Sequence, residues 1–151
     1  PDAFHQSLVD LVARPGPEGH LGHVFVRDTW PGIECVNGGF VAVRHTPVAV
    51  FFLDLWREKL RWPTLYDQSA LAETILELIG LEVERLSNGS RGYGGECLPL
   101  LFPTAGGHTP WQVYCDCWQD TLTQLVGPYR QRRSRLVSFV DPEIVDVNFV
   151  P

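Results

Sequence analysis

Residues 35–44 read CVNGGFVAVR, which has the composition of a buried β-strand interrupted near its beginning by Asn37, Gly38 and Gly39. Glycine within a strand loses packing and costs about 0.5–1 kcal/mol relative to alanine, so two in succession call for an explanation. One interpretation is an Asn-Gly hairpin turn between two short strands. The other is a close approach of the backbone to a ligand, with the Asn37 amide available to hydroxyl groups. The spacing of the residues leaves both interpretations open.

Helical periodicity follows this stretch. Thr46 and Pro47 form a typical helix start, and apolar residues then recur at helical spacing as far as Trp56. A second amphipathic helix is expected over residues 67–79, with Gly80 closing it.

Further elements are predicted on either side of these two helices. They are a short helix over 3–13, strands over 23–27, 33–44 and 136–140, and a helix over 111–125. This order of elements favours an α/β layer architecture, with a mixed sheet flanked by helices.

The composition indicates one folded domain. The chain has 151 residues, of which 44% are hydrophobic and 20% charged, as is usual for globular proteins. A net charge of −6 argues against general binding of nucleic acid, which needs an excess of basic residues. The basic run at 130–135 is either a solvated helix end or a contact for phosphate or a partner. Because the sequence lacks methionine and opens on Pro1 and Asp2, we expect a piece of a longer protein.

The chain contains four cysteines, Cys35, Cys97, Cys115 and Cys117. They lack the paired C-x-x-C or histidine spacing that is typical of zinc sites, so disulfides or buried thiols are favoured. A weaker alternative is a zinc module built from Cys97, His108, Cys115 and Cys117.

Two groups of polar residues are candidates for chemistry. Tyr66, Asp67 and Gln68 stand at the expected start of the second helix. There Asp67 either caps the helix or acts with the Gln68 amide as a ligand for sugar hydroxyls or phosphate oxygens. His108 follows a glycine-rich loop and is either a surface residue or a ligand.

Taken in order, CVNGGFVAVR, FFLDLW, YDQSAL and a histidine after a glycine-rich loop resemble the distal half of GT-A type nucleotide-sugar glycosyltransferases. The chain is similar to the yeast α-galactosyl- and mannosyltransferases and to the plant xyloglucan xylosyltransferases. The resemblance covers roughly Asp2 to Tyr129. It implies a partial, Rossmann-like GT-A domain, in which residues 1–151 form the C-terminal part of one catalytic domain whose N-terminal nucleotide-binding part is missing.

The same resemblance implies a reaction and a set of site residues. The reaction is a retaining transfer of a hexose or pentose from a nucleoside diphosphate sugar to a glycan acceptor, assisted by Mn²⁺ or Mg²⁺. Asp67 and Gln68 would be catalytic, and they would bind the sugars together with the four residues Asn37, Gly38, Gly39 and Tyr66. Asp2 and His108 would bind the metal, Asp2 as the second acid of a D-P-D motif whose first residue precedes Pro1.

The family also implies a setting in the cell, namely the secretory pathway and its Golgi compartment, with the parent protein held by an N-terminal membrane segment outside this chain. The sequence departs from the family after His108, where TPWQVYCDC stands in place of a Phe-Gly-Cys pattern. The alternative function is a non-catalytic carbohydrate-binding domain, or pseudoenzyme, of the same fold.

Overall fold

A computed structural model describes residues 22–29, 35–36, 39–62, 65–87, 92–102 and 111–143. Within these ranges the chain forms, in order, β1 (Val24–Arg27), β2 (Val41–Val43), α2 (Pro47–Lys59), α3 (Asp67–Leu86), a short 3₁₀ turn η1 (Leu98–Leu101), α4 (Trp111–Val126) and β3 (Val137–Val140). The helix expected over 3–13 lies outside the described residues.

The three strands form one mixed sheet in the order β2-β1-β3. β1 runs antiparallel to β2, with Val24 opposite Val43, and parallel to β3, with Val24 level with Val137. A parallel pair needs a long crossover connection, and α2, α3 and α4 lie within it. The predicted α/β class and the mixed sheet with helices are therefore confirmed.

Most of the predicted boundaries agree with the structure. α2 begins as expected, because the Thr46 side chain accepts a hydrogen bond of 3.2 Å from the Ala49 backbone N–H and Pro47 is the first helical residue. The predictions for β1, β3 and α4 are also confirmed. Among the described residues of the strand predicted over 33–44, Val41–Val43 pairs with β1, whereas 35–36, 39–40 and Arg44 are not in a strand, so the predicted strand is too long there.

The predicted end of α3 is wrong. The helix continues through Gly80 to Leu86. A Cβ atom at Gly80 would lie 2.6 Å from the backbone nitrogen of Tyr93, and one at Gly92 would lie 2.1 Å from the Gly80 carbonyl oxygen. Gly80 is therefore needed for the close crossing of the 92–93 backbone over the helix, and it does not end the helix.

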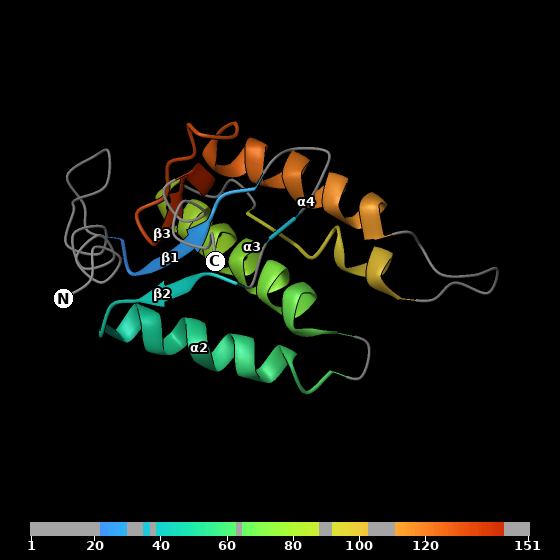
Figure 1. Cartoon of the computed structure of the whole chain (residues 1–151), viewed down its shortest axis with the longest axis horizontal. Helices are drawn as coiled ribbons and strands as arrows, with labels where there is room; N and C mark the ends of the chain where they lie inside the picture. Colours follow the sequence, from blue (N-terminus) through green and yellow to red (C-terminus); the bar gives the residue numbers. More distant parts are fainter. Residues whose placement is uncertain are drawn as a thin grey trace, which may run out of the picture.

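α3 is the central helix of the molecule. It packs against both α2 and α4 and lies between them in the view of Figure 1. Nearly every residue from Ser69 to Gly80 is buried, because this part of the helix is covered on several sides. Val24 and Val26 of β1 join the same core, whereas Phe25 points to the opposite side of the sheet and packs with Val140.

Two disulfides join α4 to earlier parts of the chain. Cys35 is bonded to Cys115, and Cys97 to Cys117. The preference for disulfides over zinc is thus confirmed. The zinc-module hypothesis is wrong, because all three of its cysteines are in disulfides and have no thiolate to bind a metal. Its fourth residue, His108, lies outside the described residues.

The described helices include none with both the length and the apolar character that a membrane span requires.

Candidate functional site

The start of α3 carries three residues that are predicted from the sequence to bind a sugar. Tyr66, Asp67 and Gln68 are all exposed, and Tyr66 retains 80% of its accessible surface. The backbone here is fixed by Ser69, whose hydroxyl accepts from the Tyr66 N–H at 2.8 Å and donates to the Tyr66 carbonyl at 3.0 Å. The three side chains therefore stand on a defined turn of backbone and face solvent.

Asp67 is the first residue of α3, and Tyr66 is its N-cap. The alternative that Asp67 itself caps the helix is therefore wrong by one position. Its carboxylate accepts a hydrogen bond of 2.8 Å from the Gln68 N–H, which still places a negative charge at the positive end of the helix dipole.

One contact brings two of the sequence motifs together in space. The indole N–H of Trp56, in FFLDLW, donates to the Asp67 carbonyl, in YDQSAL, at 3.3 Å. Trp56 is also half-buried against the core, where its ring lies 6.0 Å from that of Phe52. The last turns of α2 thus support the exposed start of α3.

The other predicted site residues are placed only in part. Gly39 precedes β2 and is exposed. Asn37, Gly38, Asp2 and His108 lie outside the described residues, so their grouping with Asp67 and Gln68 stays a prediction. The described part of the chain contains no group of three or more His, Cys, Asp or Glu residues arranged to hold a metal ion.

A buried carboxylate in the middle of α3 was not predicted. Glu73 is 2% exposed and accepts hydrogen bonds from the hydroxyls of Tyr93, at 2.8 and 2.9 Å, and Tyr114, at 2.8 Å. Burial raises the pKa of Glu73, an effect that the two tyrosines and the charge of Lys59 partly oppose and that of Glu77 reinforces. The pKa values of both tyrosines are raised as well, first by burial and then by the charge of Glu73.

The raised pKa of Glu73 predicts a pH dependence of stability. Because the carboxyl ionises more readily in the unfolded chain, its contribution to the unfolding free energy is full below its unfolded pKa and falls as pH rises through the folded pKa. The unfolding free energy of the protein minus that of Glu73→Gln should therefore decrease from acidic to neutral pH. Urea titrations at several pH values measure this difference. Glu84→Gln, on an exposed part of the same helix, is the control and should show no comparable trend.

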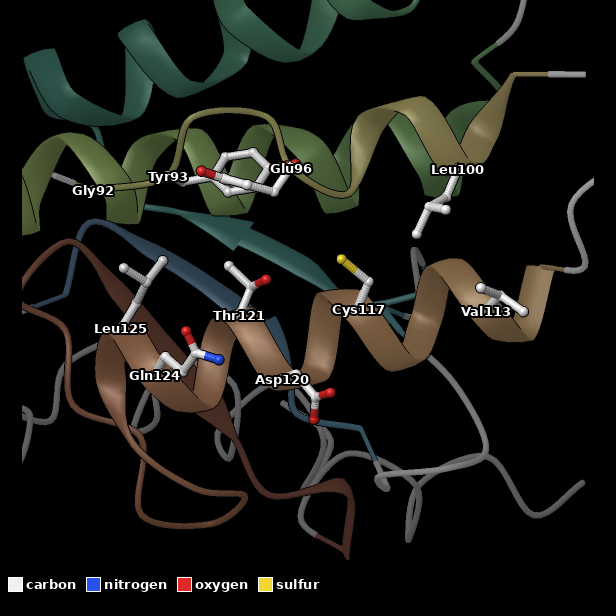
Figure 2. A pocket seen from close by; sticks show the side chains of 10 residues that line it. All are labelled: Gly92, Tyr93, Glu96, Leu100, Val113, Cys117, Asp120, Thr121, Gln124 and Leu125. Atoms are coloured by element: carbon white, nitrogen blue, oxygen red, sulfur yellow. The ribbon is translucent and has the colours of Figure 1, made fainter. Parts of the chain in front are cut away.

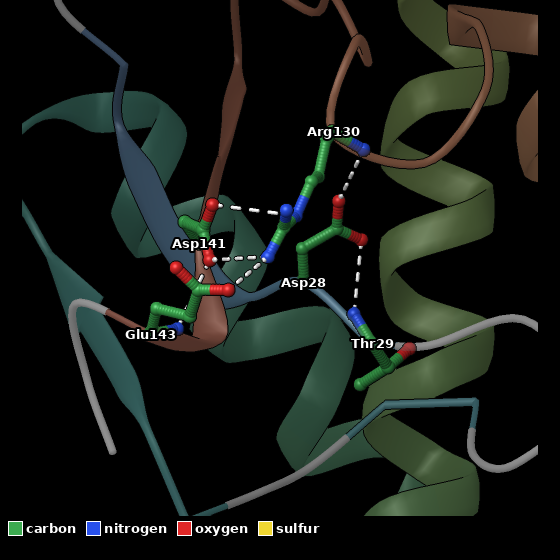
Figure 3. A network of polar contacts seen from close by, with 5 residues as sticks. All are labelled: Asp28, Thr29, Arg130, Asp141 and Glu143. Carbon is green, nitrogen blue, oxygen red and sulfur yellow. Dashed lines mark hydrogen bonds and ion pairs between the residues drawn. The ribbon is translucent and has the colours of Figure 1, made fainter. Parts of the chain in front are cut away.

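A second buried charged cluster joins the carboxyl ends of the parallel strands. Asp28 follows β1 and forms an ion pair with Arg132, the Nε–Oδ1 distance being 3.2 Å. Its oxygens also accept from the backbone N–H groups of Thr29, at 3.0 Å, and Arg130, at 3.2 Å. Figure 3 shows Arg130 extending from this point to Asp141, which follows β3. Burial raises the pKa of Asp28, and Arg132 and the two backbone donors partly offset this.

The basic run at 130–135 does not form the end of α4, which stops at Val126, and its arginines differ in their environment. Arg133 and Arg135 are exposed, so a contact of the run with phosphate or a partner stays a prediction. The Arg132 side chain is fully buried, and it donates to the Gln119 side chain. Gln119 in turn donates to the hydroxyl of Thr29 at 3.0 Å, and Thr29 donates to the carbonyl of Cys35. This chain of hydrogen bonds fixes the backbone at Cys35, two residues before the Asn-Gly-Gly stretch.

The comparisons with models of protein families, with curated proteins and with solved structures find no match for this chain.

Proposed function

We propose that this chain is part of a glycosyltransferase that moves a hexose or pentose from a nucleoside diphosphate sugar to a glycan acceptor, with retention of configuration. The proposal starts from the resemblance of four ordered motifs. The observation that carries it further is the hydrogen bond from the Trp56 indole to the Asp67 backbone carbonyl, because it joins two of those motifs beside the exposed side chains of Asp67 and Gln68.

The exposed side chains suit a sugar. An ionised carboxylate accepts hydrogen bonds from hydroxyls, and an amide both donates and accepts, so Asp67 and Gln68 can hold two or more hydroxyls of a pyranose ring. Tyr66 supplies a largely exposed ring beside them. Hydrogen bonds to a charged group contribute about 1.5–3 kcal/mol, which makes Asp67 the stronger contact of the pair.

In the proposed reaction, the bond between the anomeric carbon and the diphosphate oxygen breaks, and the oxygen keeps the electron pair. A bond to an acceptor hydroxyl oxygen forms on the same face of the sugar, and the hydroxyl proton is released. Mn²⁺ or Mg²⁺ would neutralise the charge that develops on the leaving diphosphate. Asp2 and His108 remain the proposed ligands, and the residues of the described part contribute by holding the sugar.

The test is transfer by the full-length protein from a panel of UDP- and GDP-sugars, measured as release of nucleoside diphosphate with and without Mn²⁺. Asp67→Asn should lower kcat/KM by about tenfold or more, because one charged hydrogen bond of the size above is lost. Asp116→Asn is the matched control, since Asp116 is also exposed on a helix and bonds only Gln112 among the described side chains. It should leave kcat/KM unchanged.

Two results would overturn the proposal. One is equal activity of Asp67→Asn and Asp116→Asn. The other is a protein that binds glycans but uses no donor sugar with any divalent ion, which is the behaviour of a non-catalytic carbohydrate-binding domain.

A further inference from the structure

An open groove lies between the 92–102 segment and α4, and Figure 2 shows the side chains along its two walls. Its volume is about 600 Å³, within the range of about 300–1,000 Å³ that is usual for ligand sites. The groove shares no residue with the Tyr66–Gln68 site. The lining residues that matter for binding are Tyr93, Glu96, Cys117, Asp120, Gln124 and Leu125.

The two walls are held together before any ligand binds. The disulfide between Cys97 and Cys117 joins the 92–102 segment directly to α4. The Tyr93 hydroxyl is held by the buried carboxylate of Glu73, which fixes the tyrosine ring at the groove. A preformed site loses less conformational entropy when a ligand binds.

The lining combines polar and apolar groups. Glu96 stands on one wall and Asp120 on the other, with Gln124 one turn further along α4 (Figure 2). Asp120 and Gln124 are exposed, and within the described part of the chain their side chains form no hydrogen bond or ion pair. The Tyr93 ring and Leu125 add apolar surface. Carboxylates and amides can bind hydroxyls, while an aromatic ring and aliphatic side chains can cover the C–H faces of a sugar ring.

The charge of the groove restricts the ligand. The described residues that line it include two carboxylates and no Lys, Arg or His. An anionic ligand such as a phosphate or a uronic acid would be repelled, since like charges brought close together are unfavourable. Neutral hydroxyl-rich molecules fit the lining best.

We propose that this groove binds a neutral oligosaccharide, with Asp120 and Gln124 hydrogen-bonding its hydroxyls and the Tyr93 ring covering one sugar. Identifying that oligosaccharide as the acceptor glycan rests on the proposed function. Binding itself does not, because it needs neither donor nor metal.

The test is isothermal titration of the full-length protein with cellotetraose, mannotetraose, xylotetraose and galactotetraose, and with tetragalacturonate as the anionic counterpart. At least one neutral tetrasaccharide should bind saturably, and more tightly than tetragalacturonate. The double variant Asp120→Ala/Gln124→Ala should weaken this binding by about tenfold or more.

The control is Gln112→Ala/Asp116→Ala, which removes the same two residue types at the same spacing from exposed positions on α4 outside the groove. It should bind as the wild type does. The groove assignment is overturned if no neutral tetrasaccharide binds, if tetragalacturonate binds more tightly, or if the two double variants bind equally well.

The two proposals fail in different ways. Glycan binding that Asp120→Ala/Gln124→Ala abolishes, in a protein that uses no donor sugar, would leave the groove in place and remove the transferase. Conversely, sugar transfer that depends on Asp67, together with glycan binding that the groove variants leave unchanged, would support the transferase and remove the groove assignment.

Discussion

Replacing Arg132 with methionine is expected to lower the unfolding free energy by about 3–5 kcal/mol, because the change leaves a buried carboxylate without its counter-charge. The Asp28 side chain is 2% exposed and that of Arg132 is fully buried, so water cannot replace the lost partner. The guanidinium also lies 5.3 Å from the ring centre of Phe139 and 5.7 Å from that of Trp118. Methionine restores some of this packing but none of the charge.

Urea denaturation followed by tryptophan fluorescence measures this loss. Arg133→Met is the control, since Arg133 is the neighbouring arginine and is exposed. It should change the unfolding free energy by no more than about 0.5 kcal/mol. The double variant Asp28→Asn/Arg132→Met should be more stable than Arg132→Met alone, because the uncompensated charge is then absent. Equal losses for Arg132→Met and Arg133→Met would contradict the role assigned to the ion pair.

Lowering the pH should reduce the loss of unfolding free energy that Arg132→Met causes. Burial already raises the pKa of Asp28, and removing the cation raises it further. The variant therefore loses stability relative to the wild type as pH rises through this raised value, and its deficit should be smaller at pH 4 than at pH 7.

The second large effect concerns the disulfide between Cys35 and Cys115. Its two cysteines are 80 residues apart in sequence, so in the chain-entropy model the bond destabilises the unfolded chain by about 4.5 kcal/mol. The Cys97–Cys117 bond spans 20 residues, for which the same model gives about 3 kcal/mol. We expect Cys35→Ala/Cys115→Ala to be the less stable of the two double-alanine variants.

Thermal and urea unfolding of both double variants, beside the wild type, provides the measurement. Because all four cysteines are paired, each double variant leaves the other bond intact and creates no free thiol. A larger loss on removing Cys97–Cys117 would contradict the expectation.

The helices and two of the strands could be predicted because their signals are local. α2 has its cap at Thr46 and its first residue at Pro47, and α4 has a periodic apolar face. Gly80 misled the prediction because glycine is common at helix ends and its neighbour in space, Tyr93, is distant in sequence. The disulfide pairing could not be predicted for the same reason. Four cysteines allow three pairings, and the packing of α4 against distant parts of the chain selects one of them.

In the candidate site and the two buried clusters, too, residues with a local sequence signal could be predicted, whereas residues whose partners are distant in sequence could not. Asp67 and Gln68 stand at a helix start that the sequence marks, and both are exposed there, while their role in binding stays a prediction. In the sequence, Glu73 looks like one more polar residue of an amphipathic helix. Its burial is explained by the hydroxyls of Tyr93 and Tyr114, which lie far away in sequence and donate hydrogen bonds to it. Asp28 and Arg132 meet because β1 and β3 are neighbours in the sheet, a pairing that neither segment encodes by itself.

The position of β1 between β2 and β3 has a consequence for synthesis on the ribosome. β1 and β2 are close in sequence and can pair early, whereas β3 emerges only after α2, α3 and α4 have been made. Until then one edge of β1 keeps open backbone hydrogen-bonding groups, and such edges invite pairing with other chains. A nascent or truncated chain that ends before Val137 would therefore be the form most prone to aggregate and most dependent on chaperones.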